Sequence, residues 1–139
     1  MNIDTERKRR YQEKLNFIID KINNLPPYND NSLLEFRPFF LESLFYRTQV
    51  ATDAIMDVIA MLCKDNNIIV MDDYHNIDSL INEKILSPEL GDNLKRLNGL
   101  RNVIVHKYNG IDEKKILDNL EEILEVIVKF VEFAEEYVK

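Results

Sequence analysis

Apolar residues recur at intervals of three and four along most of this chain, and that spacing is the feature that most restricts its fold. It is the period of an α-helix, whereas a half-buried strand alternates apolar and polar residues. No stretch alternates in that way for long, and three Gly residues leave little material for hairpin turns. The pattern therefore predicts an all-α protein.

Turn-forming residues divide the chain into separate helices. We expect helices over residues 5–24, 32–66, 76–86, 88–105 and 112–138. Pro26 and Pro27 end the first, because proline lacks a backbone donor and disfavours helix before it. Ser87 followed by Pro88 is typical of a helix N-terminus. These segments predict an up-and-down bundle of four to five helices that forms a single domain, 1–139.

The expected second helix carries an unusually wide apolar stripe. Its centre consists of Phe40, Leu44, Ala51, Ile55, Val58 and Leu62. One flank adds Leu41, Phe45 and Ile59, and the other adds Val50, Ala54 and Met61. Such a stripe requires burial against more than one neighbour, at the centre of a bundle or at a subunit interface. We predict a homodimer with the second and fourth helices near its two-fold axis.

Composition excludes several classes of protein. The net charge of −7 disfavours general binding to DNA or another polyanion, although a local basic site remains compatible with it. Cys63 is the sole cysteine, which excludes a disulfide framework and fits a buried apolar residue in a cytoplasmic protein. We expect neither a membrane span nor a secretory signal, because no apolar run approaches the required length and none follows the charged residues 1–10.

Arg101 is the most informative residue of the expected fourth helix. Leu94, Leu97 and Ile104 lie within about 60° of Leu90 on the helical wheel, and Arg101 lies among them at about 20°. Burying an unpaired charge is costly, so the guanidinium must be paired or must face a wet cleft. One interpretation is a structural Arg paired with an acid elsewhere in the chain.

A second interpretation is a phosphate-binding cleft. Residues 93–111 contain no Asp or Glu but hold Lys95, Arg96, Arg101 and Lys107. Arg binds phosphate with two parallel hydrogen bonds, and a histidine such as His106 can move protons near neutral pH. The plainer alternatives are a solvated basic face and a surface histidine favoured by the helix C-terminus.

The angular positions of these side chains restrict how they can cooperate. Asn102 and His106 are four residues apart and share one side of a helix. Arg101 and His106 are about 140° apart on an ideal helix. They can share one pocket if the helix end loosens, or if two chains each contribute a copy.

The segment 101–108 reads RNVIVHKY and matches the R-x4-H-x-Y pattern of HEPN-domain proteins. It most resembles the HepT toxins, which pair with a minimal nucleotidyltransferase (MNT) antitoxin. Residues 46–51 followed by Asp53 and Asp57, Gly99–Leu100, and 109–112 also resemble that family. The resemblance covers about residues 33–135, whereas the charged N-terminal helix and residues 68–75 match no pattern of the family.

The resemblance implies a metal-independent endoribonuclease without a cofactor, active on an RNA such as tRNA or mRNA. A homodimer would bring two R-x4-H motifs into one cleft. His106 would then exchange protons with the RNA 2′-OH or the leaving oxygen, Arg101 would neutralise the phosphorane-like oxyanion, and Asn102 would orient one of these groups. Lys95, Arg96 and Lys107 are the candidate RNA-binding residues.

The resemblance also implies a means of control. The MNT antitoxin would transfer AMP to Tyr108, where bulk and negative charge would block the cleft. A packing role at the helix end is the alternative for Tyr108. Two other functions stay open for the whole chain: a catalytically idle HEPN protein that binds a nucleotidyltransferase, and a structural helical adaptor.

Two acidic clusters outside the fourth helix are weaker candidates for a site. Asp53 and Asp57, four residues apart, could bind a metal, but a solvated or Arg-pairing face is the favoured interpretation. Asp72, Asp73 and His75 are dense in potential ligands, yet they lie in an expected connector without a further spaced ligand.

Overall fold

A computed structural model describes residues 1–105 and 113–139 of the chain. Its elements are α1 (Thr5–Asn23), η1 (Asn31–Phe36, a 3₁₀ helix), α2 (Arg37–Asp65), α3 (Asp73–Asn82), α4 (Pro88–Val105), α5 (Glu113–Asp118) and α6 (Leu120–Val138). The described residues contain no strand, which confirms the all-α prediction. Within the same ranges, no helix combines the length and apolar character needed to cross a bilayer.

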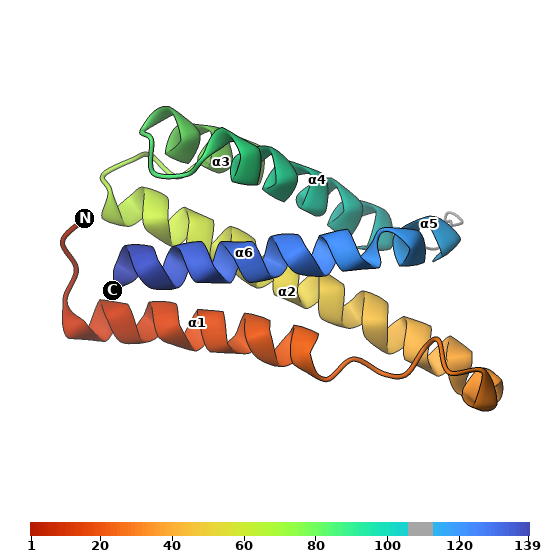
Figure 1. The fold of residues 1–139 in the computed structure, drawn as a ribbon. Helices are drawn as coiled ribbons and strands as arrows, with labels where there is room; N and C mark the ends of the chain where they lie inside the picture. Colours follow the sequence, from red (N-terminus) through yellow and green to blue (C-terminus); the bar gives the residue numbers. More distant parts are fainter. Residues whose placement is uncertain (106–112) are drawn as a thin grey trace.

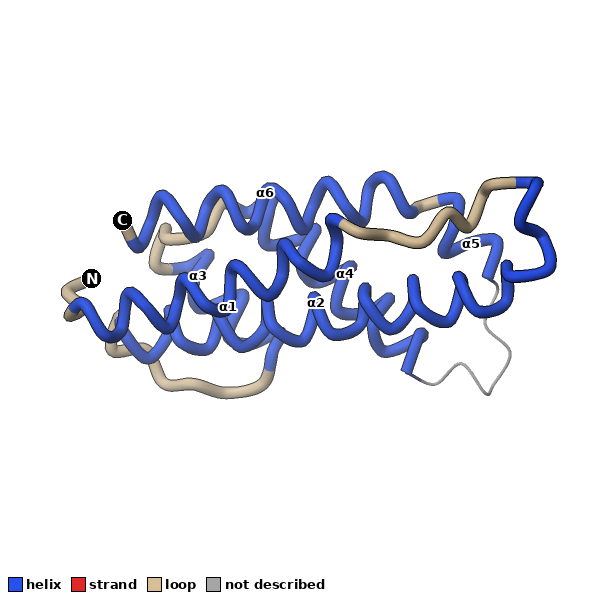
Figure 2. The backbone as a smooth tube through the Cα atoms, turned by 90° about the horizontal axis from the view of Figure 1, so that it is seen from below, coloured by secondary structure: helices blue, strands red, loops and turns tan. Residues whose placement is uncertain are grey.

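The four long helices α1, α2, α4 and α6 run along one another as an elongated bundle, with both chain termini at the same end (Figure 1). The short helix α3 lies beside α4 at the end that holds the termini, and η1 and α5 lie at the opposite end (Figures 1 and 2). Helix α2 is central, because it contacts α1, α3, α4 and α6.

Most of the apolar stripe of α2 is covered within the chain, while Phe40, Val50 and Met61 are only partly buried. Ile55, Ile59 and Leu62 are fully buried in a core that includes side chains from α1, α3, α4 and α6. A position at the centre of the bundle therefore explains the width of the stripe without a subunit interface. Large apolar side chains are exposed elsewhere, near the two ends of α2: Leu34, Phe36, Phe39 and Tyr46 at one, and Ile69, Val70 and Met71 at the other.

A smaller core surrounds the C-terminal end of α4. Leu44 and Phe45 of α2 pack there with Ile104 of α4, Ile116 of α5 and Leu120 of α6. These contacts attach the last turn of α4 to α2, and so they set the position of Arg101 one turn earlier.

Three of the predicted helices differ from the structure in their bounds. The second segment opens as η1, with Leu33 at φ −118° and ψ 26°, and its α-helix begins only at Arg37. The third helix spans Asp73–Asn82 rather than 76–86, because the Asp72 carboxylate accepts the His75 backbone N–H and Lys84 turns the chain at φ 59°. The fifth segment is divided at Asn119 into α5 and α6.

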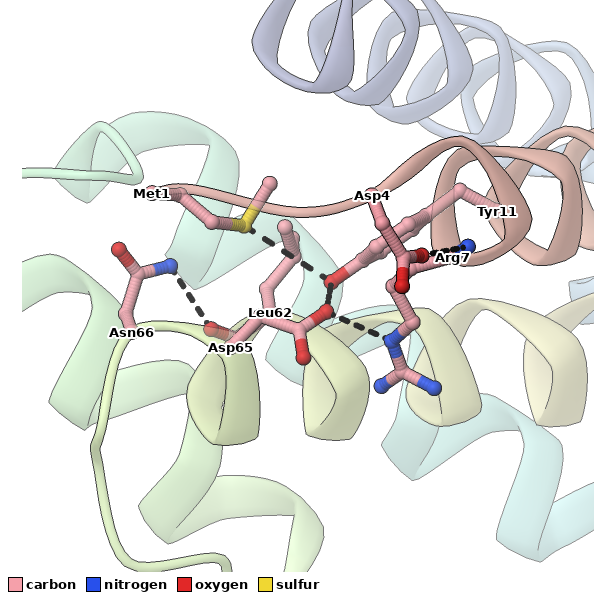
Figure 3. Close-up of polar contacts among 7 residues, drawn as sticks. All are labelled: Met1, Asp4, Arg7, Tyr11, Leu62, Asp65 and Asn66. Carbon is pink, nitrogen blue, oxygen red and sulfur yellow. Dashed lines mark hydrogen bonds and ion pairs between the residues drawn. The ribbon is translucent and has the colours of Figure 1, made fainter.

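A buried polar contact joins α1 to the C-terminal end of α2 (Figure 3). Tyr11 is fully buried, and its hydroxyl donates to Asp65 Oδ2 at 2.5 Å. Arg7 Nε donates to the same oxygen at 2.8 Å. Burial and this carboxylate raise the pKa of Tyr11 above its ordinary value. The charged N-terminal helix is therefore anchored to the central helix.

Candidate active site

Local sequence signals set the start of α4, and packing sets its rotation. Ser87 Oγ accepts the Leu90 backbone N–H at 3.1 Å, which confirms the predicted helix cap. Leu94, Leu97 and Ile104 are buried on the face that was expected to be apolar. Arg101, on the same face, keeps 30% of its side chain exposed.

Arg101 is held by two side chains. Its Nε donates to Asp53 Oδ1 at 2.6 Å, and its Nη1 donates to Asn102 Oδ1 at 3.1 Å. The Asp53 side chain is 42% exposed, so the ion pair lies at the protein surface. The guanidinium is therefore paired and also reaches solvent, the two situations that the sequence presented as alternatives.

The Asp53–Asp57 pair does not act as one acidic cluster. Asp53 contacts Arg101, whereas Asp57 accepts from Lys14 Nζ at 3.1 Å. This confirms the Arg-pairing interpretation for Asp53. Both aspartates line an open groove of about 880 Å³ between α1 and α2, which Arg10 also lines.

Acids of neighbouring helices pair with two bases in the part of α4 that has no acid, residues 93–105. Lys95 forms an ion pair with Asp78 of α3, and this hydrogen bond raises the pKa of Lys95. Arg96 is exposed and lines a different groove, of about 680 Å³, between α4 and α6. Lys95 and Arg101 thus pair with acids of α3 and α2, whereas Arg96 contacts Asn93 within α4, and the structure does not bring the three bases together.

Three site residues from the sequence analysis lie outside the described residues. These three are His106, Lys107 and Tyr108, and their roles stay predictions. Asn102, the remaining one, is exposed and contacts Arg101.

The second acidic cluster serves a local structural purpose. Asp72 caps α3, and its Oδ2 lies 2.7 Å from His75 Nδ1. The backbone N–H of His75 is the main cause that lowers the pKa of Asp72. Within residues 1–105 and 113–139, no group of three or more His, Cys, Asp or Glu side chains is arranged to hold a metal ion.

Cys63 agrees with its predicted role as a buried apolar residue. It is fully buried in the main core, and its Sγ lies 3.6 Å from the Asn76 carbonyl oxygen. Burial raises the pKa of its thiol, which favours the neutral form.

Comparison with known families identifies the chain. A family model described as "Ribonuclease HepT-like" matches residues 18–134. The chain belongs to the HepT-like ribonuclease family. Two curated relatives from Archaeoglobus fulgidus carry the name "Putative RNase". One is 34% identical over 130 residues that cover 94% of each chain, and the other is 37% identical over 93% of this chain and 96% of the relative.

Solved structures show the fold of this HepT-like chain. A mutant of the toxin–antitoxin MntA-HpeT has a TM-score of 0.78 at 20% identity, over 91% of this chain and 98% of that chain. A tri-AMPylated HEPN toxin of Shewanella oneidensis in complex with MNT antitoxin has a TM-score of 0.69 at 17% identity, over 96% and 99%. YutE, a cytosolic protein of Bacillus subtilis, has a TM-score of 0.73 at 14% identity, over 98% and 91%. The predicted HEPN fold is confirmed.

Proposed function

We propose that this chain is the toxin of a HEPN/MNT toxin–antitoxin module and a metal-independent endoribonuclease. The observation that carries the proposal is Arg101, which is fixed by Asp53 and Asn102 yet reaches solvent, in a chain of the HepT-like ribonuclease family. Arg101 begins the R-x4-H motif that His106 completes. A fixed, solvent-accessible guanidinium is the group needed to receive a phosphate.

The proposed reaction uses the nucleophile that RNA itself contains. The 2′-oxygen forms a bond to the adjacent phosphorus, and the bond from phosphorus to the 5′-oxygen breaks. The 2′-OH proton passes to an imidazole of His106, and the leaving 5′-oxygen receives a proton from an imidazole. The products are a 2′,3′-cyclic phosphate and a 5′-hydroxyl. Neither a metal ion nor a protein nucleophile is required by this scheme.

Arg101 and Asn102 would act on the phosphate. Negative charge develops on the non-bridging oxygens as phosphorus becomes five-coordinate, and a positioned guanidinium stabilises it more in the transition state than in bound RNA. Asn102 already contacts Arg101 and can orient either that side chain or the phosphate.

We further propose that the site is assembled in a homodimer. Arg101 and His106 are about 140° apart on a regular helix, so a single chain whose fourth helix continued regularly to His106 would direct them toward different sides. A two-fold axis would place both residue types, one from each chain, beside one phosphate. Lys95, Arg96 and Lys107 would bind the flanking RNA, and Lys95 would have to leave Asp78 or share its charge to do so.

Control by an MNT nucleotidyltransferase completes the proposal. The structural neighbours include a HEPN toxin that is tri-AMPylated and complexed with MNT antitoxin. Transfer of AMP to Tyr108 of this chain would place a phosphodiester charge two residues from His106. The modified toxin should lose RNA binding, because the charge of the AMP group competes with the RNA phosphate and its bulk blocks the cleft.

The proposal is tested by RNA cleavage with purified protein. Arg101→Ala and His106→Ala should each lower the cleavage rate by about 100-fold or more, while helicity is unchanged. The chain offers a matched control in its other histidine, His75 of α3. This residue contacts Asp72, the N-cap of that helix, and has no role in the proposed reaction. His75→Ala should retain cleavage, and EDTA should leave the wild-type rate unchanged. An inactive wild type, or loss of activity with chelator that a divalent metal restores, would contradict the proposal.

The proposed modification has its own test. Tyr108→Phe keeps the aromatic ring and removes the hydroxyl that would accept AMP. After co-expression with an MNT antitoxin, mass spectrometry should find added AMP on Tyr108 of the wild-type toxin. The Tyr108→Phe toxin should cleave RNA and resist neutralisation. Added AMP on another residue instead, or full neutralisation of Tyr108→Phe, would refute this assignment.

A further inference from the structure

We propose that Asp53 is a positioning residue for Arg101, and that it presents the guanidinium to the RNA phosphate in a fixed orientation. The inference rests on the proposed ribonuclease function. It concerns a residue of α2 that lies 48 positions from Arg101 in the sequence and contacts it directly.

The contact leaves the outer part of the guanidinium available for a ligand. Asp53 accepts from Nε at 2.6 Å, and Asn102 accepts from Nη1 at 3.1 Å. A guanidinium has five N–H donors in a planar fork. These acceptors use Nε–H, which lies on the edge shared with Nη2, and one Nη1 hydrogen; within the described residues Nη2 has no acceptor. A phosphate can therefore approach Nη2 without displacing Asp53.

Asp53 is well suited to hold Arg101 because its own backbone is rigid. Its neighbours Thr52 and Ala54 are buried, and Thr52 Oγ1 donates to the Thr48 carbonyl oxygen at 2.8 Å within α2. Helix α2 is packed on several sides by other helices. The carboxylate therefore occupies a fixed point, and a charge-assisted hydrogen bond at 2.6 Å transfers that constraint to the guanidinium.

Electrostatics make the role distinguishable from simple competition. A carboxylate beside Arg101 partly cancels its positive charge, so it weakens ground-state attraction for RNA. If Asp53 only competed with phosphate, its neutralisation would raise both affinity and rate. If Asp53 positions Arg101, neutralisation should leave KM unchanged or lower it, while kcat falls because the guanidinium is no longer aligned with the transition state.

The test compares Asp53→Asn with Asp57→Asn in steady-state RNA cleavage. Both changes remove one carboxylate from the same face of α2, but Asp57 contacts Lys14 instead of Arg101. We expect kcat of Asp53→Asn to fall about 10- to 100-fold with no increase in KM, whereas Asp57→Asn stays within about twofold of wild type. Asp53→Glu, which restores the charge, should recover part of kcat. Circular dichroism and light scattering check that fold and oligomeric state are retained.

The exchange rate of the Arg101 Nε–H, measured by ¹⁵N NMR, is a readout that does not depend on activity. The hydrogen bond to Asp53 should slow this exchange in wild type and in Asp57→Asn, and the protection should be weaker in Asp53→Asn, whose amide oxygen is a neutral acceptor. Unchanged kcat in Asp53→Asn, or a rise in kcat/KM, would overturn the positioning role even where the Nε–H protection is weaker. An inactive wild type with Nε–H protection intact would refute the proposed function and leave the measured contact standing as a structural ion pair.

Discussion

At the scale of single residues, the Tyr11 hydroxyl shows how a polar group is accommodated in the core. It donates to Asp65, whose side chain is 13% exposed and which also accepts from Arg7. A hydrogen bond to a charged group contributes more than a neutral one, and a buried carboxylate that loses a donor is costly. The contact should therefore contribute measurably to the stability of the α1–α2 packing.

Tyr11→Phe should lower the free energy of unfolding by about 1.5 to 3 kcal/mol, as measured by urea denaturation. Tyr137→Phe is the matched control. Its hydroxyl donates to the neutral Asn66 Oδ1 at 3.1 Å from a partly buried position, so its loss should cost about 1 kcal/mol or less. Equal losses of unfolding free energy in the two variants would show that the hydrogen bond from Tyr11 to Asp65 contributes no more than the one from Tyr137 to Asn66.

Tyr11 also predicts how stability depends on alkaline pH. Burial, and then the Asp65 carboxylate, raise the pKa of this phenol above the ordinary value of 10.0. The folded state therefore retains a proton that the unfolded state loses. The contribution of Tyr11 to the free energy of unfolding is complete below about pH 10. It is lost as pH rises toward the folded pKa, by up to about 1.4 kcal/mol per pH unit.

Urea midpoints measured from pH 8 to pH 11 should thus fall for wild type and fall less for Tyr11→Phe. Lysine ion pairs such as Lys95–Asp78 weaken in the same range, so the difference between the two proteins is the relevant quantity. Parallel curves for the two proteins would contradict the prediction.

At the scale of elements, two glycines of α4 differ in their surroundings. A Cβ at Gly91 would overlap Ile81 of α3, whose Cγ1 would lie at 2.8 Å. A Cβ at Gly99 would meet only the Tyr74 hydroxyl, at an ordinary 3.7 Å. The close approach of α3 to α4 therefore requires a small residue at position 91, but not at position 99.

Gly99→Ala should stabilise the protein by about 0.5 to 1 kcal/mol, because alanine favours helix over glycine. Gly91→Ala gains the same propensity but displaces Ile81, so it should be neutral or destabilising, by up to about 2 kcal/mol. Thermal unfolding of the two variants tests the difference. An equal gain in both would mean that Ile81 moves aside at no cost.

At the scale of the whole molecule, α2 does not by itself require a second chain, because most of its stripe is covered by four helices of the same bundle. The reason to expect a dimer now lies in the site. One regular helix cannot direct Arg101 and His106 at the same phosphate.

Light scattering should therefore give a mass of twice 16.5 kDa at micromolar concentration. The specific RNase activity should fall on dilution in step with the monomer fraction, since an isolated chain holds half of the proposed cleft. A monomeric but fully active protein would contradict the composite site.

Signals that act over a few residues were sufficient to predict much of the fold. The helical period located the long helices, Ser87 marked the start of α4, and the stripe on α2 predicted burial against more than one neighbour. The division at Asn119 was missed because no Gly or Pro marks it and the apolar spacing continues across it from Ile116 to Ile123. In the structure, Ile116 and Leu120 are both buried in the small core at the end of α4.

The amino-acid sequence by itself determined that Arg101 lies on an apolar helical face and must have a partner or a wet cleft, because a helix repeats every 3.6 residues and a buried charge is costly. The tertiary structure alone decided that the partner is Asp53 and that Lys95 is paired with Asp78. Each of these pairs joins two helices. Which acid faces which base depends on how those helices are rotated and shifted against each other, and that is set by the packing of the whole core.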